Sequence, residues 1–128
     1  MEANKIIITG GATRIGAAIA KKLSGPNKEI LIHYNKSKVK AETLKKELEK
    51  NGTKIYLTRG DLSKETDVNK VIRFAKSKLK YFDCLINNAS LFENDKLDNF
   101  TTDSWGKHLR TNLRSPALLS KVFSKNIK

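Results

Sequence analysis

The stretch KIIITGGATRIG, residues 5–16, decides the fold. Its β-branched apolar run ends at Thr9, and the two glycines behind it free the backbone to turn into a helical pattern that opens near Arg14. Free N–H groups and the positive end of a helix dipole would meet at this turn, and α/β folds hold pyrophosphate groups in this way. Many similar turns serve only to pack a helix tightly. The stretch alone therefore predicts either a dinucleotide site or a close helix contact.

The composition fits one globular domain over residues 1–128, with 38% hydrophobic and 30% charged residues. No apolar run is long enough to cross a membrane. The first strand begins by Lys5, so we expect no signal peptide and a cytoplasmic location. The only cysteine, Cys84, lies in an apolar run and is expected to pack in the core. His108 has no partner at metal-ligand spacing, and we expect no metal site.

The formal net charge of +13 is the unusual bulk property, and it favours a polyanionic partner. Most of the cations, however, are lysines spread over helix faces, without an arginine cluster or interleaved aromatic residues. We interpret them as a solvated surface. Such a surface binds nucleic acid nonspecifically at low salt, and no specific nucleic-acid partner is expected.

Short apolar runs alternate with helical patterns along the chain. The expected order is a strand ending at Thr9, a helix over 14–23, a strand over 29–34, a helix over 38–50, a strand over 54–58, a helix over 64–79, a strand over 83–86 and a helix from 102. Ser37 and Ser63 are the expected N-caps of the second and third helices. Pro116 predicts a break or kink in the last helix.

Strands that alternate with helices predict a parallel α/β sheet with right-handed crossovers. The expected strand order is 3-2-1-4. Strands one and four would then flank the point where the order reverses, so residues 10–16 and 87–90 would face one crevice at the carboxyl ends of the strands.

Four motifs, in this order, resemble those of the short-chain dehydrogenase/reductase family. They are the Thr9-Gly10-(x)3-Arg14-Ile15-Gly16 turn, in which Arg14 replaces the family's middle glycine, the Asp61-Leu62 pair, the Asn87-Asn88-Ala89-Ser90 turn and Asn112. The resemblance implies a Rossmann-like fold and oxidoreductase activity with a nicotinamide cofactor. It also implies that Asp61 contacts the adenine and that Asn112 is the asparagine of the catalytic tetrad.

Within that family, the chain is most similar to pteridine reductases and dihydromonapterin reductases. The similarity rests on the arginine in the glycine turn, the segment His33-Tyr34-Asn35-Lys36-Ser37, Ser90 and an aromatic residue at Phe92. In those enzymes the aromatic residue stacks on the pterin. The resemblance implies a pterin or small carbonyl substrate if a second chain completes the site.

The end of the second strand favours NADP(H) over NAD(H). An NAD site usually has an acidic residue there for the ribose 2′-hydroxyl, whereas this chain offers Lys36 and Ser37, with Arg14 across the turn. Two alternatives remain open, namely that Lys36 is only a surface lysine and that His33 is a buried strand residue. The expected cofactor-binding residues are Thr9, Gly10, Arg14, Ile15, Gly16, His33, Tyr34, Asn35, Lys36, Ser37, Asp61, Leu62, Asn88, Ala89 and Ser90.

The family's chemistry also needs a tyrosine, with a lysine four residues later, beyond the fourth strand. All three tyrosines of this chain, Tyr34, Tyr56 and Tyr81, precede the Asn87–Ser90 turn, so the chain resembles the first half of a reductase, truncated before its fifth strand. Three hypotheses follow: a truncated reductase that binds cofactor but is inactive alone, one half of a split reductase, and a basic binding protein.

A sheet that stops at this point would expose two apolar surfaces. The strand over 83–86 would be an edge without a charge, proline or bulge to block pairing with another chain. The last helix would expose Leu118, Leu119, Val122 and Phe123. We therefore expect a homodimer or larger assembly with the last helices at the contact.

Overall fold

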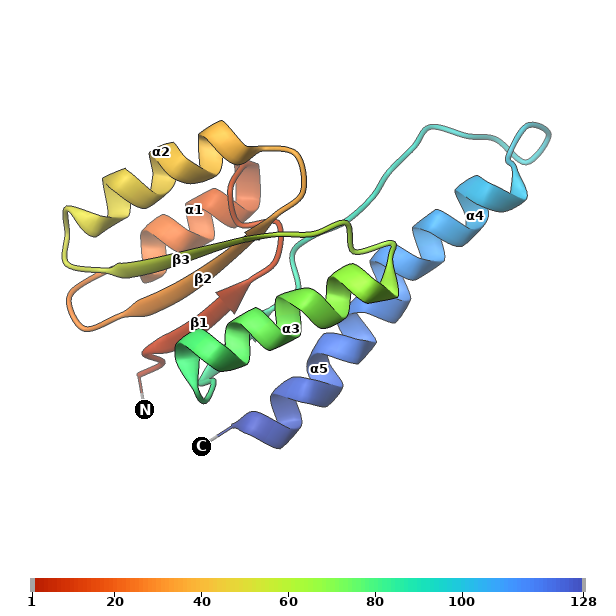
Figure 1. Ribbon diagram of the computed structural model, residues 1–128. Helices are drawn as coiled ribbons and strands as arrows, with labels where there is room; N and C mark the ends of the chain where they lie inside the picture. The colour runs from red at the N-terminus through yellow and green to blue at the C-terminus, as the bar shows by residue number, and fades with distance from the viewer. Residues whose placement is uncertain (1, 128) are drawn as a thin grey trace.

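The computed structural model describes residues 2–127, which form a parallel four-stranded sheet with helices on both faces (Figure 1). The elements are β1 (Lys5–Ile8), α1 (Arg14–Leu23), β2 (Glu29–Tyr34), α2 (Lys38–Glu49), β3 (Lys54–Arg59), α3 (Glu65–Leu79), β4 (Cys84–Ile86), α4 (Thr102–Leu109), the π-helical segment η1 (Arg110–Arg114) and α5 (Ser115–Asn126). The strand order is β3-β2-β1-β4, as the sequence predicts.

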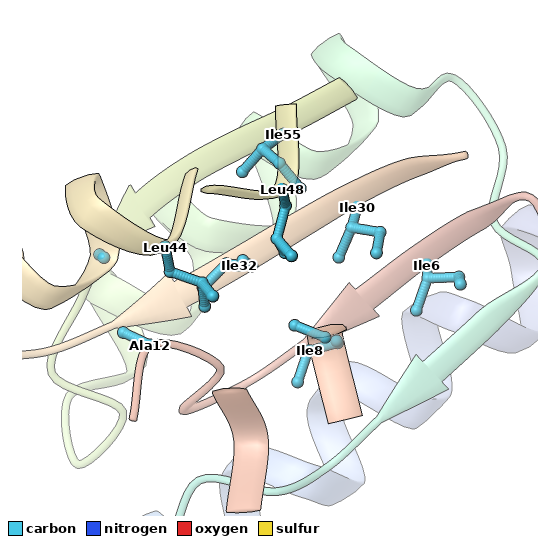
Figure 2. Close-up of a cluster of buried hydrophobic side chains, with 10 residues drawn as sticks. Ile6, Ile8, Ala12, Ile30, Ile32, Leu44, Leu48 and Ile55 are labelled. Carbon is cyan, nitrogen blue, oxygen red and sulfur yellow. The ribbon is translucent and has the colours of Figure 1, made fainter. Parts of the chain in front are cut away.

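Alternation along the strands decides which helices cover which face. Ile6 and Ile8 of β1 point to the face that α1 and α2 cover, while Ile7 points to the face under α3 and α5. Figure 2 shows the first of these clusters, in which Leu44 and Leu48 of α2 lie over isoleucines from the three longer strands. Because both faces are covered, the strands are almost continuously apolar, as in other parallel sheets.

The start of α3 differs from the expectation. Ser63 is not its N-cap, because the helix begins at Glu65 and Lys64 takes the cap position without a side-chain bond. The Ser63 hydroxyl instead donates to Asp61 Oδ1 at 2.7 Å. A serine that finds an acceptor two residues back forms a local turn and is lost as a helix cap. The expected cap at Ser37 is in place by position, also without a side-chain bond.

Pro116 does not break the last helix. The backbone stays helical from α4 through η1 into α5, and the Ser115 N–H bonds to the Arg110 carbonyl, five residues back. This wider turn precedes the proline. Proline has no backbone N–H to donate, and it is tolerated here because it lies in the first turn of α5. The expected break is therefore absent, and the irregularity before the proline is the π-helical segment η1.

The apolar face of α5 is covered, contrary to expectation. Leu119 is buried, and Val122 and Phe123 pack against residues of the sheet and of α3. The gap left between these elements has a volume of only about 10 Å³. The helix lies beside α3 (Figure 1), and α3 covers the apolar face that the sequence predicts to be exposed.

Apolar side chains are exposed elsewhere on the last helix. Trp105, Leu109 and Leu113 are exposed, and the Phe100 ring packs against Trp105 at a tilt, with ring centroids 5.8 Å apart. The β4 strand forms the edge of the sheet, as predicted, and its three residues are half-buried. No helix within residues 2–127 is long and apolar enough to cross a bilayer.

Candidate functional site

A crevice opens at the carboxyl ends of β1 and β4, where the strand order reverses. It consists of a cavity of about 590 Å³ and a neighbouring one of about 180 Å³. The larger is lined by Gly10, Ala12, Thr13, Arg14, Ile15, Gly16, His33, Tyr34, Asn35, Lys36, Ser37, Asn88, Ala89, Ser90 and Leu91. Asp61 and Leu62 line the smaller one. The structure thus brings all the expected cofactor-binding residues except Thr9 to the walls of one crevice.

The glycine turn is packed too tightly for side chains. Gly10 has φ +62°, and a Cβ on it would lie 3.0 Å from the Ala89 Cα. A Cβ on Gly16 would collide with the Gly10 carbonyl oxygen and lie 2.6 Å from Asn88 Nδ2. The start of α1 therefore lies directly against the turn, and both lie against the loop that follows β4.

Thr9 and Asn88 fasten this turn to the loop after β4. The Asn88 amide donates to the carbonyls of Thr9 and Gly10, at 3.0 Å each. The Thr9 hydroxyl accepts the N–H groups of Asn88 and Ala89 at 3.1 and 3.0 Å. Thr9 is 1% exposed, so its side chain acts within the protein and lies behind the cavity wall.

The N-terminus of α1 presents unused donors to the larger cavity. The first N–H groups of a helix have no partner inside it, and the Thr13 side chain does not cap them. Arg14, the first residue of the helix, has φ +52°, a conformation that glycine adopts far more readily than arginine. The sequence therefore places a cation here at a conformational cost, at the positive end of the α1 dipole.

His33 lies below the turn with a 2% exposed side chain. Its Nδ1 accepts the Gly10 N–H at 3.1 Å, and its Nε2 lies 2.8 Å from the Gly60 carbonyl oxygen. Burial lowers the pKa of His33, and the Gly60 bond and the Asp67 charge only partly oppose this effect. Both ring nitrogens are used within the protein, so the ring offers no hydrogen bond to a ligand.

The polar residues expected to bind the 2′-phosphate follow the end of β2. Asn35, Lys36 and Ser37 line the larger cavity together with Arg14, and the Arg59 Nε donates to the Asn35 carbonyl at 3.0 Å. The lining of this cavity includes two cations, Arg14 and Lys36, and no acidic residue. Its charge is complementary to that of a phosphate.

The smaller cavity has a carboxylate in a fixed position. Asp61 Oδ1 accepts from the backbone and the hydroxyl of Ser63, at 3.0 and 2.7 Å. Partial burial raises the pKa of Asp61, but these two bonds and the charges of Lys64 and Lys107 outweigh it and hold the pKa below its usual value. Asp61 is therefore an ionised hydrogen-bond acceptor near neutral pH.

Comparison with known proteins identifies the family. The model of the family described as short chain dehydrogenase matches residues 4–128. The chain belongs to the short-chain dehydrogenase family. It is also 33% identical over 113 residues to the short-chain dehydrogenase/reductase FrzI of a Cladobotryum species, a match that covers 88% of this chain and 44% of FrzI.

Two solved short-chain dehydrogenase relatives share the fold and contain NADP. The Burkholderia cenocepacia J2315 short chain dehydrogenase in complex with NADP is 27% identical, with a TM-score of 0.90, over 97% of this chain and 51% of that one. Brucella canis FolM, an alternative dihydrofolate reductase 1 complexed with NADP, is 29% identical, with a TM-score of 0.87, over 98% of this chain and 50% of that one. The chain spans about half the length of these relatives.

Asn112, the family's expected tetrad residue, binds the loop after β4. Its amide accepts the Leu91 N–H at 2.7 Å and donates to the Leu91 carbonyl at 2.8 Å. Asn112 is exposed and lies in η1, outside both cavity linings. Phe92, the expected pterin contact, is 84% exposed, and the structure does not bring it to the crevice.

His108, for which the sequence indicates no role, binds backbone groups on two segments. Its Nδ1 lies 2.8 Å from the Ser104 carbonyl oxygen, and its Nε2 accepts the Glu93 N–H at 3.0 Å. The ring therefore joins α4 to the loop after β4. A single histidine on a helix gives no sequence signal for such a backbone contact.

No tyrosine within residues 2–127 lies on a helix with a lysine four residues later, as the chemistry of the short-chain dehydrogenase family needs. Tyr34 and Lys38 have the four-residue spacing, but Tyr34 ends β2 and Lys38 begins α2. The Tyr56 hydroxyl donates to Glu29 at 3.0 Å, and Lys5 lies over the Tyr81 ring. Among residues 2–127 there is also no cluster of three or more metal-ligating side chains.

Proposed function

We propose that this chain binds NADP(H) as the dinucleotide-binding half of a short-chain reductase. The observation that carries the proposal is the larger cavity, where uncapped N–H groups of α1, Arg14 and Lys36 face a space without carboxylates. In this arrangement the α1 N-terminus holds the pyrophosphate. Lys36, Ser37 and Arg14 hold the 2′-phosphate, and Asp61 accepts from the adenine amino group. The NADP complexes of the similar Burkholderia and Brucella proteins support the choice of cofactor.

Calorimetric titration of the purified chain with NADPH and NADH tests the proposal. NADPH should bind about tenfold to a hundredfold more tightly, since a charge-assisted phosphate contact contributes about 1.5–3 kcal/mol. Lys36→Glu should abolish this preference. Lys70→Glu makes the same charge change on an exposed position of α3, away from the crevice, and should keep it. Equal or tighter binding of NADH by the unaltered chain would contradict the assignment.

The protein's proposed substrate class is a pterin or small carbonyl compound, reduced only when the missing half is supplied. The support is the similarity to pteridine reductases at Arg14, residues 33–37 and Ser90, together with the dihydrofolate reductase name of the similar Brucella protein. Asn112 alone provides no proton transfer near neutral pH. The chain by itself should therefore not oxidise NADPH with dihydropterin or carbonyl substrates above background.

Supplying the second half distinguishes the two reductase hypotheses. NADPH oxidation that appears only when a chain carrying the rest of the fold is added would support the split reductase. If the lone chain turned over and Asn112→Ala abolished that turnover, the prediction that the chain is inactive by itself would be wrong. The cytoplasmic location stays a prediction.

The basic binding protein remains the second candidate, supported by the net charge of +13. It requires nucleic-acid binding that survives physiological salt. Gel shifts in rising salt should instead show binding that disappears by about 0.2 M, as expected of lysine contacts to phosphates alone.

A further inference from the structure

The hydrogen bonds of His33 fix the protonation state of its ring. The Gly10 N–H can only donate, so Nδ1 must be the unprotonated nitrogen that accepts it. The Gly60 carbonyl can only accept, so Nε2 must carry the proton. One neutral tautomer satisfies both partners. In a doubly protonated ring, the Nδ1 proton would face the Gly10 N–H, and neither group could accept a hydrogen bond.

His33 also holds the next residue of the turn. The Gly11 N–H donates to the His33 main-chain carbonyl at 3.0 Å, so two successive N–H groups of the turn end on this one residue. Gly10 takes its positive φ between these two bonds. The ring reaches the lining of both cavities and lies between the turn and the end of β3.

We propose that His33 is a positioning residue, whose neutral ring holds residues 10–16 in the conformation that binds the cofactor pyrophosphate. The proposal rests on the proposed function and adds to it a dependence of cofactor affinity on pH. When the ring is protonated, the Gly10 bond is lost and the turn is released. Cofactor binding then weakens although no group that touches the cofactor has changed.

Charged groups of both signs lie around the ring, and burial decides the direction of the effect. Asp67 on α3 favours the protonated ring. Arg14 and Lys36 line the larger cavity with His33, and Asp61, Glu93 and Lys107 line the smaller one with it. Burial lowers the pKa of His33 below 6.5 in spite of Asp67, so the turn is released only when the pH falls below this lowered pKa.

The test compares NADPH affinity from pH 7.5 down to the lowest pH at which both proteins stay folded, in the unaltered chain and in His33→Asn, whose amide can still accept the Gly10 N–H but does not titrate. The 2′-phosphate of the ligand has its own pKa of about 6, and its titration cancels in the ratio of the two dissociation constants. The dissociation constant of the unaltered chain, divided by that of His33→Asn, should rise severalfold as the pH falls. At pH 7.5, His33→Leu should bind roughly two- to tenfold more weakly, and His33→Asn should recover most of that loss.

His108 provides the matched control, since these two are the only histidines in the chain. His108→Gln should keep the pH profile of the unaltered chain. A profile that stays the same in His33→Asn, or tight binding by a folded His33→Leu, would overturn the proposal.

Nuclear magnetic resonance of the free chain separates this proposal from the proposed function. Long-range proton–nitrogen spectra should show His33 protonated at Nε2, and exchange of the Gly10 and Gly11 amides should be slow and become faster in His33→Leu. Slow exchange without NADPH binding at any pH would overturn the proposed function and leave the His33–Gly10 contact established. An Nδ1-protonated ring, or exchange unchanged in His33→Leu, would overturn the positioning role itself.

Discussion

At the scale of single residues, the site requires a glycine at Gly16 but not at Gly25. A Cβ on Gly16 would collide with the Gly10 carbonyl, whereas one on Gly25 would meet nothing within 4 Å. Gly16→Ala should lower the free energy of unfolding by about 2 kcal/mol or more and abolish cofactor binding. Gly25→Ala should leave stability unchanged or raise it by about 0.5 kcal/mol. Urea denaturation of both variants measures the difference, and equal stabilities would contradict the packing described here.

His33 also makes stability depend on pH. Its pKa is lowered in the folded chain from 6.5, so between the folded pKa and pH 6.5 the unfolded chain binds the extra proton. Stability should therefore be full above about pH 6.5 and decrease as the pH falls through this window. Urea midpoints at pH 7.5, 6.5 and 5.5 measure the decrease, which should be smaller in His33→Asn. A variant that loses stability as steeply as the unaltered chain would assign the effect to other groups.

Thr9 and Asn88 show what the sequence could predict about the site and what it could not. The motifs placed both residues at the crevice, where Asn88 lines the larger cavity and Thr9 lies buried behind its wall. The sequence did not show that the Thr9 hydroxyl would be used by two N–H groups of the loop after β4. That contact joins residues 79 apart, and no local pattern encodes it. The same reason explains why the backbone contact of His108 was missed.

At the scale of elements, apolar periodicity was sufficient for the strands and for α1, α2, α3 and α5, because each of them has a buried or half-buried face. In α4 and η1 the same periodicity marks a face that no other element within residues 2–127 covers. Periodicity failed where a side chain chose between partners, as at Ser63, and where a helix changed its hydrogen-bond spacing, as before Pro116. The proline was visible in the sequence. The wider turn that accommodates it depends on backbone bonds that residue type does not reveal.

The loop after β4 depends on one side chain of η1. Asn112 binds both the N–H and the carbonyl of Leu91, so Asn112→Ala leaves two backbone groups without these partners. The loop should open more often, and limited proteolysis between residues 91 and 101 should become severalfold faster. Asn94→Ala, at an exposed position of the same loop, is the matched control and should be cleaved at the original rate. Equal rates in the two variants would show that Asn112 does not hold the loop.

At the scale of the whole molecule, the exposed apolar surface is on α4 and η1 and not on α5. Trp105, Leu109 and Leu113 lie at successive helical turns, and Phe100 packs beside them. The prediction of self-association therefore stays, but its contact moves to this face. Salt at about 0.15 M limits repulsion between the positively charged copies to roughly 8 Å.

Sedimentation at micromolar concentration should show a dimer or larger species that Leu109→Glu converts to monomer. Val39→Glu changes an exposed apolar residue on α2, away from this face, and should leave the assembly intact. A chain that is monomeric from the start would refute the prediction. Dissociation by both variants would point to charge and not to this face.

The strand order also has a consequence for how the protein is made. The strands β1, β2 and β3 pair with near neighbours in the sequence, but β4 must return to β1, and Asn88 to Thr9, across 79 residues. Synthesis at roughly 5–20 residues per second brings Asn88 out of the ribosome about 4–16 s after Thr9. During that time the edge of β1 and the glycine turn have no partner from this chain. The nascent chain is then most open to wrong pairing at the place that later becomes its crevice.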